Sequence, residues 1–124
     1  MIIREVIARV DLKKPNAFDD EQKVRWLAEL DGKIAADVML QSISDLQQYN
    51  YKYPEAMDFE LLVHFPHDDI YELWLAAQID KANGEVDLYM NSKEAYNASY
   101  INFSCWFANV YDPAQGYMRS DGYV

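Results

Sequence analysis

The sequence predicts an all-α domain of about four helices, and three observations support this fold class. Apolar side chains recur at the three- and four-residue steps of an amphipathic helix in four separate stretches. Two of these stretches begin with the residue pattern of a capping box, which satisfies the free N–H groups of a helix start. Only 8 of the 124 residues are glycine or proline, so few helix breakers interrupt the pattern.

The first two helices are expected over residues 3–13 and 20–41, each with an apolar stripe at helical spacing. Asp19 is expected to cap the second helix, because Gln22 follows in the capping-box position. Gly32 falls in the middle of this helix, where glycine costs about 1 kcal/mol relative to alanine. A close backbone contact at Gly32 would compensate for that cost.

Residues 41–66 lack a clean period and predict an extended excursion between the second and third helices. Within it, FELLVHF at 59–65 is apolar with some β character. A lone strand leaves backbone groups unpaired, so the sequence favours an extended segment lying over the helices, or one that pairs with another subunit. Leu62→Asp is therefore expected to keep the helices and block assembly. The residues expected at an interface are Tyr51, Tyr53, Phe59, Leu61, Leu62, Val63 and Phe65.

The third and fourth helices are expected over residues 67–90 and 92–110, as an antiparallel hairpin. The break is placed at Asn91, because Glu94 stands in the capping-box position after it. Residues 1–112 form the predicted domain, and 113–124 a flexible tail. The predicted core comprises Leu27, Ile34, Leu73, Trp74, Ala77, Tyr100, Phe103 and Phe107.

Three polar residues of the hairpin need separate consideration. Asp80 and Asn83 are three positions apart and are neighbours on one helix surface, and Asn97 belongs to the antiparallel partner helix. Together they form a predicted polar patch that clamps the hairpin or contacts a neighbouring subunit. The alternative is that all three are ordinary exposed polar residues.

The sequence gives little sign of catalytic chemistry. It has no phosphate-binding glycine loop, no cysteine cluster and no HExxH motif. His64 and His67 flank Pro66, which breaks any regular helical presentation of metal ligands. We therefore expect both histidines to be ordinary residues of a polar loop at a helix start, not metal ligands. Cys105 is expected to be a buried, inert thiol, because no basic residue lies near it in sequence. We expect no catalytic residue, no metal and no cofactor.

The net charge is −10 and is unevenly distributed. Residues 1–40 carry seven basic and eight acidic side chains, whereas residues 41–124 carry four and thirteen. A protein that reads nucleic-acid sequence needs a basic footprint on phosphates, and the second part of the chain lacks one. The start of the chain is too charged for a signal peptide and no apolar run reaches the length of a membrane span, so a cytosolic setting is expected.

Several segments carry a resemblance to a known family. They are IREVIARVD near the start, EQKVRWLAELDGKI at 21–34, ELLV at 60–63, IYELWLAAQIDKANGEVDLYMNS at 70–92 and AYNASYINFSCWF at 95–107. In order and spacing they resemble the head–tail connector or adaptor (head completion) proteins of tailed bacteriophages. None of these segments is a catalytic signature.

The resemblance implies a helical structural protein of the virion, not an enzyme, that is present in the host bacterial cytoplasm during assembly. Its partners would be further copies of itself in a ring, the portal protein and a tail-side adaptor. DNA would pass through the ring without sequence-specific binding, and an acidic surface would keep DNA from sticking. The stretch 41–66 would reach a neighbouring subunit or ring.

Two other classes remain open. One is an acidic phage DNA mimic or inhibitor that binds a basic host protein, which should be a monomer or dimer with carboxylates spaced like phosphates. The other is a small helical enzyme whose carboxylates carry acid–base chemistry.

Overall fold

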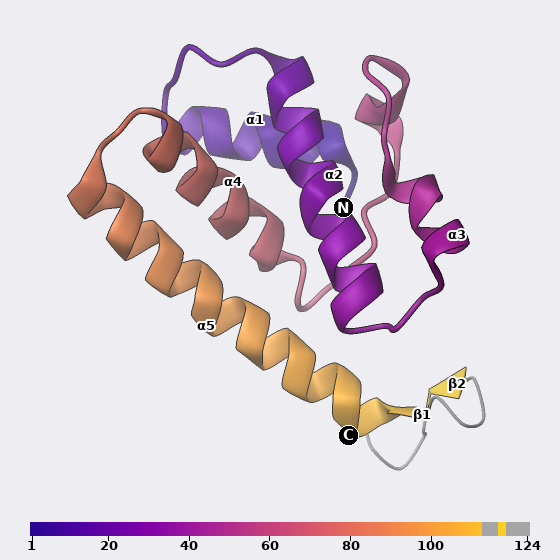
Figure 1. The fold of residues 1–124 in the computed structure, drawn as a ribbon. Coiled ribbons are helices and arrows are strands. Elements are labelled where there is room, and N and C mark those ends of the chain that lie inside the picture. Colours follow the sequence, from indigo (N-terminus) through magenta and orange to yellow (C-terminus); the bar gives the residue numbers. More distant parts are fainter. Residues whose placement is uncertain (113–116, 119–124) are drawn as a thin grey trace.

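The computed structural model describes residues 1–112 and 117–118, and it confirms the all-α fold class. Five α-helices dominate the chain, with two short 3-10 turns after the second helix and a pair of two-residue antiparallel strands after the last (Figure 1). The elements are α1 (Ile3–Lys13), α2 (Asp20–Asp37), α3 (Ile43–Leu46), η1 (Gln47–Tyr49), η2 (Glu55–Asp58), α4 (Asp69–Ala82), α5 (Val86–Val110), β1 (Tyr111–Asp112) and β2 (Tyr117–Met118). The flexible tail expected over 113–124 lies outside the described residues, apart from the two of β2.

α4 occupies the centre of the domain. α5 packs along one side of it, and α1 and α2 pack on the other side, as Figure 1 shows. Because three helices surround α4, its buried residues are not confined to one stripe. α5 is 25 residues long against 14 for α4, so its C-terminal half extends past the start of α4 (Figure 1).

The break between the last two helices was expected at Asn91, and that position is wrong. α4 ends at Ala82, and Gly84 takes a φ of +73°, a left-handed conformation that glycine adopts without steric penalty. Asn91 therefore lies inside α5. The position of the helix break is thus set by Gly84 and not by the capping-box pattern at Asn91.

The start of α2 confirms the expected cap, and its end corrects the expected length. The Asp19 carboxylate accepts a hydrogen bond from the Gln22 N–H at 2.9 Å. The helix ends at Asp37 rather than at residue 41. A Cβ built on Gly32 would meet no atom within 4 Å, so the expected close backbone contact at this glycine is absent.

The apolar segment 59–65 finds its partner within the chain. Ile2 and Glu60 form an antiparallel bridge, and the Leu61 N–H donates to the Met1 carbonyl oxygen at 3.0 Å. The N-terminal residues thus pair with the edge that the sequence alone left without a partner. This pairing places the excursion between η2 and α4 against α1.

The core confirms most of the predicted residues and corrects three. Leu27, Ile34, Trp74, Ala77 and Phe103 are buried. Leu73, Tyr100 and Phe107 are only half-buried. Tyr100 and Phe107 belong to α5, which is covered on one side, whereas Leu73 belongs to α4. The core also contains Leu61 and Val63, which were expected at an interface, and Tyr71, for which no prediction was made.

Candidate functional site

A carboxylate that pairs with no cation among the described residues lies in the interior of the domain. Asp31 of α2 is fully buried, and it accepts hydrogen bonds from the hydroxyls of Tyr51 and Tyr71, both at 2.6 Å. The Leu62 N–H also donates to it, at 3.1 Å. The Tyr71 hydroxyl in turn accepts the Val63 N–H at 2.6 Å. These four hydrogen bonds join the excursion and α4 to α2.

Burial controls the ionisation of this cluster. Desolvation raises the pKa of Asp31 above its usual 3.8, and the hydrogen bonds from the two tyrosines and Leu62 oppose that rise. Desolvation, together with the neighbouring carboxylate, raises the pKa of Tyr51 and of Tyr71. Both tyrosines therefore stay neutral and keep the protons that they donate. The cluster anchors the excursion and α4 to α2, with Asp31 and Tyr71 fully buried and Tyr51 half-buried at its edge.

Sequence reasoning missed Asp31, although a signal was present. Asp31 lies four positions after Leu27 and three before Ile34, in the middle of the apolar stripe of α2. A carboxylate at such a position is buried only with hydrogen-bond partners, and tyrosines are suitable donors. The partners come from 20 and 40 residues away, which no local pattern shows.

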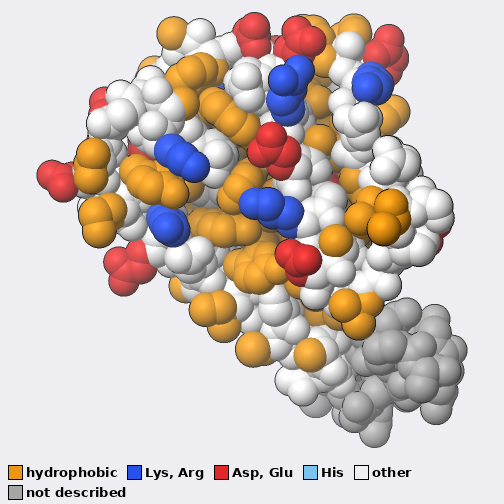
Figure 2. All heavy atoms as spheres, in the orientation of Figure 1, with side chains coloured by type: hydrophobic (Ala, Val, Ile, Leu, Met, Phe, Trp, Pro, Cys, Tyr) orange, Lys and Arg blue, Asp and Glu red, His pale blue; other side chains and the backbone are white. Residues whose placement is uncertain are grey.

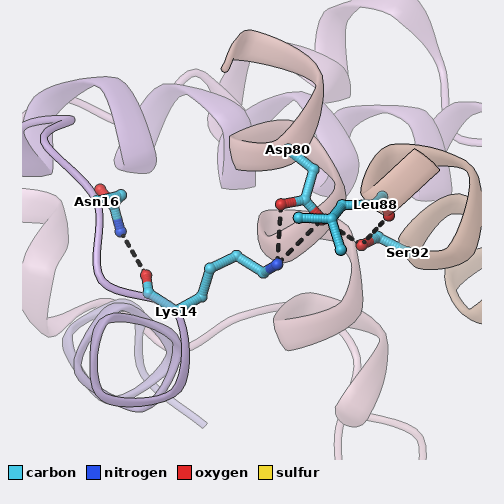
Figure 3. Close-up of polar contacts among 5 residues, drawn as sticks. All are labelled: Lys14, Asn16, Asp80, Leu88 and Ser92. Atoms are coloured by element: carbon cyan, nitrogen blue, oxygen red, sulfur yellow. Dashed lines mark hydrogen bonds and ion pairs between the residues drawn. The ribbon is translucent and has the colours of Figure 1, made fainter. Parts of the chain in front are cut away.

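A second polar cluster lies where α1, α4 and α5 meet (Figure 3). Asp80 is 1% exposed, and the Lys14 ammonium contacts both of its carboxylate oxygens, at 2.8 and 3.1 Å. The Ser92 hydroxyl of α5 reaches the same carboxylate and lies 2.9 Å from the Leu88 carbonyl oxygen. The Asn16 side-chain amide donates to the Lys14 carbonyl oxygen at 3.0 Å. The cluster holds the end of α1 against the turn of the hairpin.

The structure does not bring the predicted polar patch together. Asp80 faces Lys14 in the interior, whereas Asn83 and Asn97 are exposed. Asp80 lies level with Ser92, and Asn97 is five positions further along α5, about 7.5 Å at 1.5 Å per residue. Of the three predicted residues, only Asp80 holds the hairpin together, and its partners Lys14 and Ser92 were not predicted from the sequence.

The seven predicted interface residues divide by burial. Leu61 and Val63 are within the core, so their side chains are not on the surface that a partner would meet. Leu62 is half-buried and packs against the core. The expectation that Leu62→Asp keeps the helices stays a prediction, and the packing of Leu62 adds that a charge there would lie against apolar side chains and lower the stability. Tyr51 is half-buried and anchored to Asp31.

The other three residues remain available on the surface. Phe65 is 86% exposed, Phe59 46% and Tyr53 44%. Water-exposed aromatic side chains of this size are typical of protein interfaces. Phe65 is therefore the strongest candidate of the predicted set.

The C-terminal half of α5 presents a surface that the sequence analysis treated as core. No residue from Ala95 to Val110 is charged, and Figure 2 shows no acidic or basic side chain on the part of α5 that projects from the domain. Ile101 is 59% exposed on this half. Cys105 is also exposed, which corrects the expectation of a buried thiol.

Within the described part of the chain, the structure assembles no metal-binding cluster of His, Cys, Asp and Glu side chains. The His67 ring packs against the Trp106 ring at 4.8 Å between centroids, and against Phe103 at 5.9 Å. This histidine is part of the contact between the start of α4 and α5. Among the described helices, none has the length and apolar character needed to cross a membrane.

Comparison with known proteins adds no relative to this description. No protein-family model, no curated protein and no solved structure matches the chain.

Proposed function

We propose that this chain is a structural virion protein that joins the portal of a phage capsid to the tail, as one subunit of a ring through which DNA passes. The order of the segments that resemble head–tail connector proteins supports this assignment. The helical hairpin and the excursion before it are the parts that would contact neighbouring subunits.

One observation carries the proposal. The uncharged half of α5, residues 95–110, covers about 24 Å of helix at 1.5 Å per residue. It projects beyond α4 and exposes Ile101 on a chain with a net charge of −10 (Figure 2). Within residues 1–112 this stretch belongs to the longest run without a charged side chain. Two acidic proteins can approach along an uncharged helix without bringing like charges together, so this surface suits a protein partner.

The acidic remainder of the surface suits passage of DNA, because like charge opposes adsorption of the phosphate backbone. It is less suited to mimicry of DNA. Several carboxylates are neutralised by ion pairs within the chain, among them Asp11, Glu72 and Asp80. Asp31 is buried and presents no charge to a partner.

The proposal is tested in a phage that carries this gene. Ile101→Asp places a charge on the uncharged half of α5 at an exposed position, so the fold should remain intact. We expect DNA-filled heads and free tails to accumulate without joining. Leu88→Asp, which is 48% exposed at the other end of the same helix, is the matched control and should yield tailed particles.

Normal numbers of infectious, tailed virions with Ile101→Asp would remove the support that α5 gives to the proposal. Normal virions from a phage that lacks the gene altogether would refute the proposed function itself. If the purified protein instead formed a stoichiometric complex with a basic host protein and was absent from virions, the DNA-mimic alternative would replace it.

A further inference from the structure

A groove runs between α2 and residues 46–53. Its volume is about 590 Å³, and its walls include the aromatic rings of Tyr49, Tyr51 and Tyr53. Tyr49 is buried and Tyr51 is held by Asp31, so two of these rings are fixed in place. The groove is thus a preformed, partly aromatic surface depression rather than a gap between mobile side chains.

Gly32 lines this groove, and its presence there is unexplained by contacts within the chain. Glycine is unfavourable in the middle of a helix, and a Cβ at this position would meet no atom within 4 Å. The position has an ordinary helical backbone in α2 and does not need the conformational freedom of glycine. The missing side chain instead leaves room for a group from outside the chain.

The charges at this groove differ from those elsewhere on the protein. Among the ten lysines and arginines of residues 1–112, Arg25, Lys52 and Lys81 form neither an ion pair nor a contact with an aromatic ring, and the first two line the groove. Glu21 and Glu29 also line it, so the groove is neutral overall. Arg25 and Lys52 form no ion pair within residues 1–112, so each can pair with a carboxylate of an occupant.

The same chain presents such an acidic, aromatic group. Phe65 is 86% exposed in the loop before α4. Asp68 and Asp69 belong with Phe65 to the lining of a separate, mainly acidic depression. This lining also contains Arg9 and a Glu60 carboxylate paired with the N-terminal ammonium. No residue is shared between that lining and the lining of the groove. Phe65 and the groove are therefore two different surfaces of one molecule.

We propose that Phe65 and its acidic loop, from one copy of this chain, occupy the groove beside α2 of the next copy. The ring of Phe65 would lie over Gly32 between the tyrosines, and the adjoining carboxylates would meet Arg25 and Lys52. A contact between two different surfaces is heterologous, and it produces a ring when the rotation between copies closes. This inference rests on the proposed ring and names the contact that would build it.

The test uses two complementary variants of the full chain. Phe65→Asp removes the aromatic group and leaves the groove intact, whereas Gly32→Trp fills the groove and leaves Phe65 intact. Each variant alone should self-associate at least tenfold more weakly than the wild type in sedimentation equilibrium, which corresponds to about 1.4 kcal/mol. Mixed together, the two should form a dimer and nothing larger, because only one productive contact remains. Leu12→Asp matches Phe65 in exposure, at 86%, and should associate like the wild type.

A covalent test covers the case of weak association. In a Cys105→Ser background, Phe65→Cys protein is mixed with Gly32→Cys protein and a short bis-maleimide reagent. The mixture should give a cross-linked dimer, and Leu12→Cys in place of Phe65→Cys should not. Equal cross-linking by the two would overturn the proposed contact.

Loss of association in one variant with no dimer in the mixture would also overturn it. Binding of the wild type and of Phe65→Asp to the portal protein separates this inference from the proposed function. If the protein binds the portal but the Phe65 contact does not form, the proposed function stands and the proposed contact is wrong. If the contact forms but the protein binds no portal, the contact stands and the proposed function is wrong.

Discussion

The Tyr71 hydroxyl lies 2.6 Å from the Asp31 carboxylate, and this hydrogen bond joins α4 to α2 in the interior of the domain. The same hydroxyl oxygen accepts the Val63 N–H, so one tyrosine connects two helices and the excursion between them. Tyr51 meets the other oxygen of the carboxylate from the half-exposed side. The two tyrosines therefore differ in burial and in the number of bonds they make, although they share an acceptor.

Tyr71→Phe should lower the free energy of unfolding by about 2–4 kcal/mol, because it leaves the buried Val63 N–H without an acceptor and Asp31 without one donor. Tyr51→Phe is the matched comparison and should cost about 1 kcal/mol, since water can replace its hydroxyl. Urea denaturation of the three proteins gives both differences. Equal costs would show that the bond to Val63 contributes nothing.

The pH dependence of stability should carry a contribution from Asp31 with a definite sign. Burial raises the pKa of the folded-state carboxyl above 3.8, so the folded protein holds this proton more tightly than the unfolded chain does. The contribution to stability is fully present below 3.8 and is lost as pH rises through the folded-state pKa.

Asp31→Asn isolates that contribution, because all other titrating groups are common to both proteins. The stability of the wild type relative to Asp31→Asn should fall as pH rises above 3.8 and through the folded-state pKa of Asp31. Urea midpoints of the two proteins across this range measure the difference. A relative stability that rises with pH would mean that the hydrogen bonds outweigh burial and lower the pKa of Asp31.

Phe103→Ala should destabilise the protein by about 3–5 kcal/mol, the range for truncation of a buried phenylalanine. Phe103 is 2% exposed, whereas Ile101 on the same helix is 59% exposed. Ile101→Ala should therefore change the stability by about 0.5 kcal/mol or less. Thermal unfolding of both variants tests the placement of α5, and a loss below about 1 kcal/mol for Phe103→Ala would contradict it.

Gly32→Ala should raise the free energy of unfolding of the monomer by about 0.5–1 kcal/mol, because alanine is the better helix former and its Cβ meets nothing. Chemical denaturation measures the change. Gly84→Ala is a useful contrast, since the left-handed φ of +73° should make that substitution destabilising. A loss of stability in Gly32→Ala would show that α2 is strained at this residue.

The sequence predicted the helices from features that are local. The stripe of Ile3, Val6 and Val10 gave α1 its observed bounds, and the cap at Asp19 gave the start of α2. Each depends on residues within one or two turns, so the pattern needs no knowledge of the fold. The turn at Gly84 was missed because a glycine can either end a helix or lie on the small-residue face of a closely packed helix. Only the backbone conformation distinguishes these two roles.

The interior polar groups and the free surfaces could not be predicted in this way. Asp31 depends on tyrosines from other elements, and Asp80 on Lys14 from the end of α1. Leu61 and Val63 were expected at an interface because an apolar run shows no partner in sequence. In the fold, the N-terminal residues supply that partner, and Phe65 is the most exposed apolar residue of the run, at 86% against 46% for Phe59.

Electron microscopy of the purified protein mixed with the portal protein of the same phage tests the central claim most directly. The proposed function predicts an added ring of density at the tail-side end of the portal, coaxial with its channel. The uncharged half of α5, residues 95–110, should lie at a contact between proteins within that ring. Portal particles that remain bare at saturating concentrations of the native protein would contradict the claim.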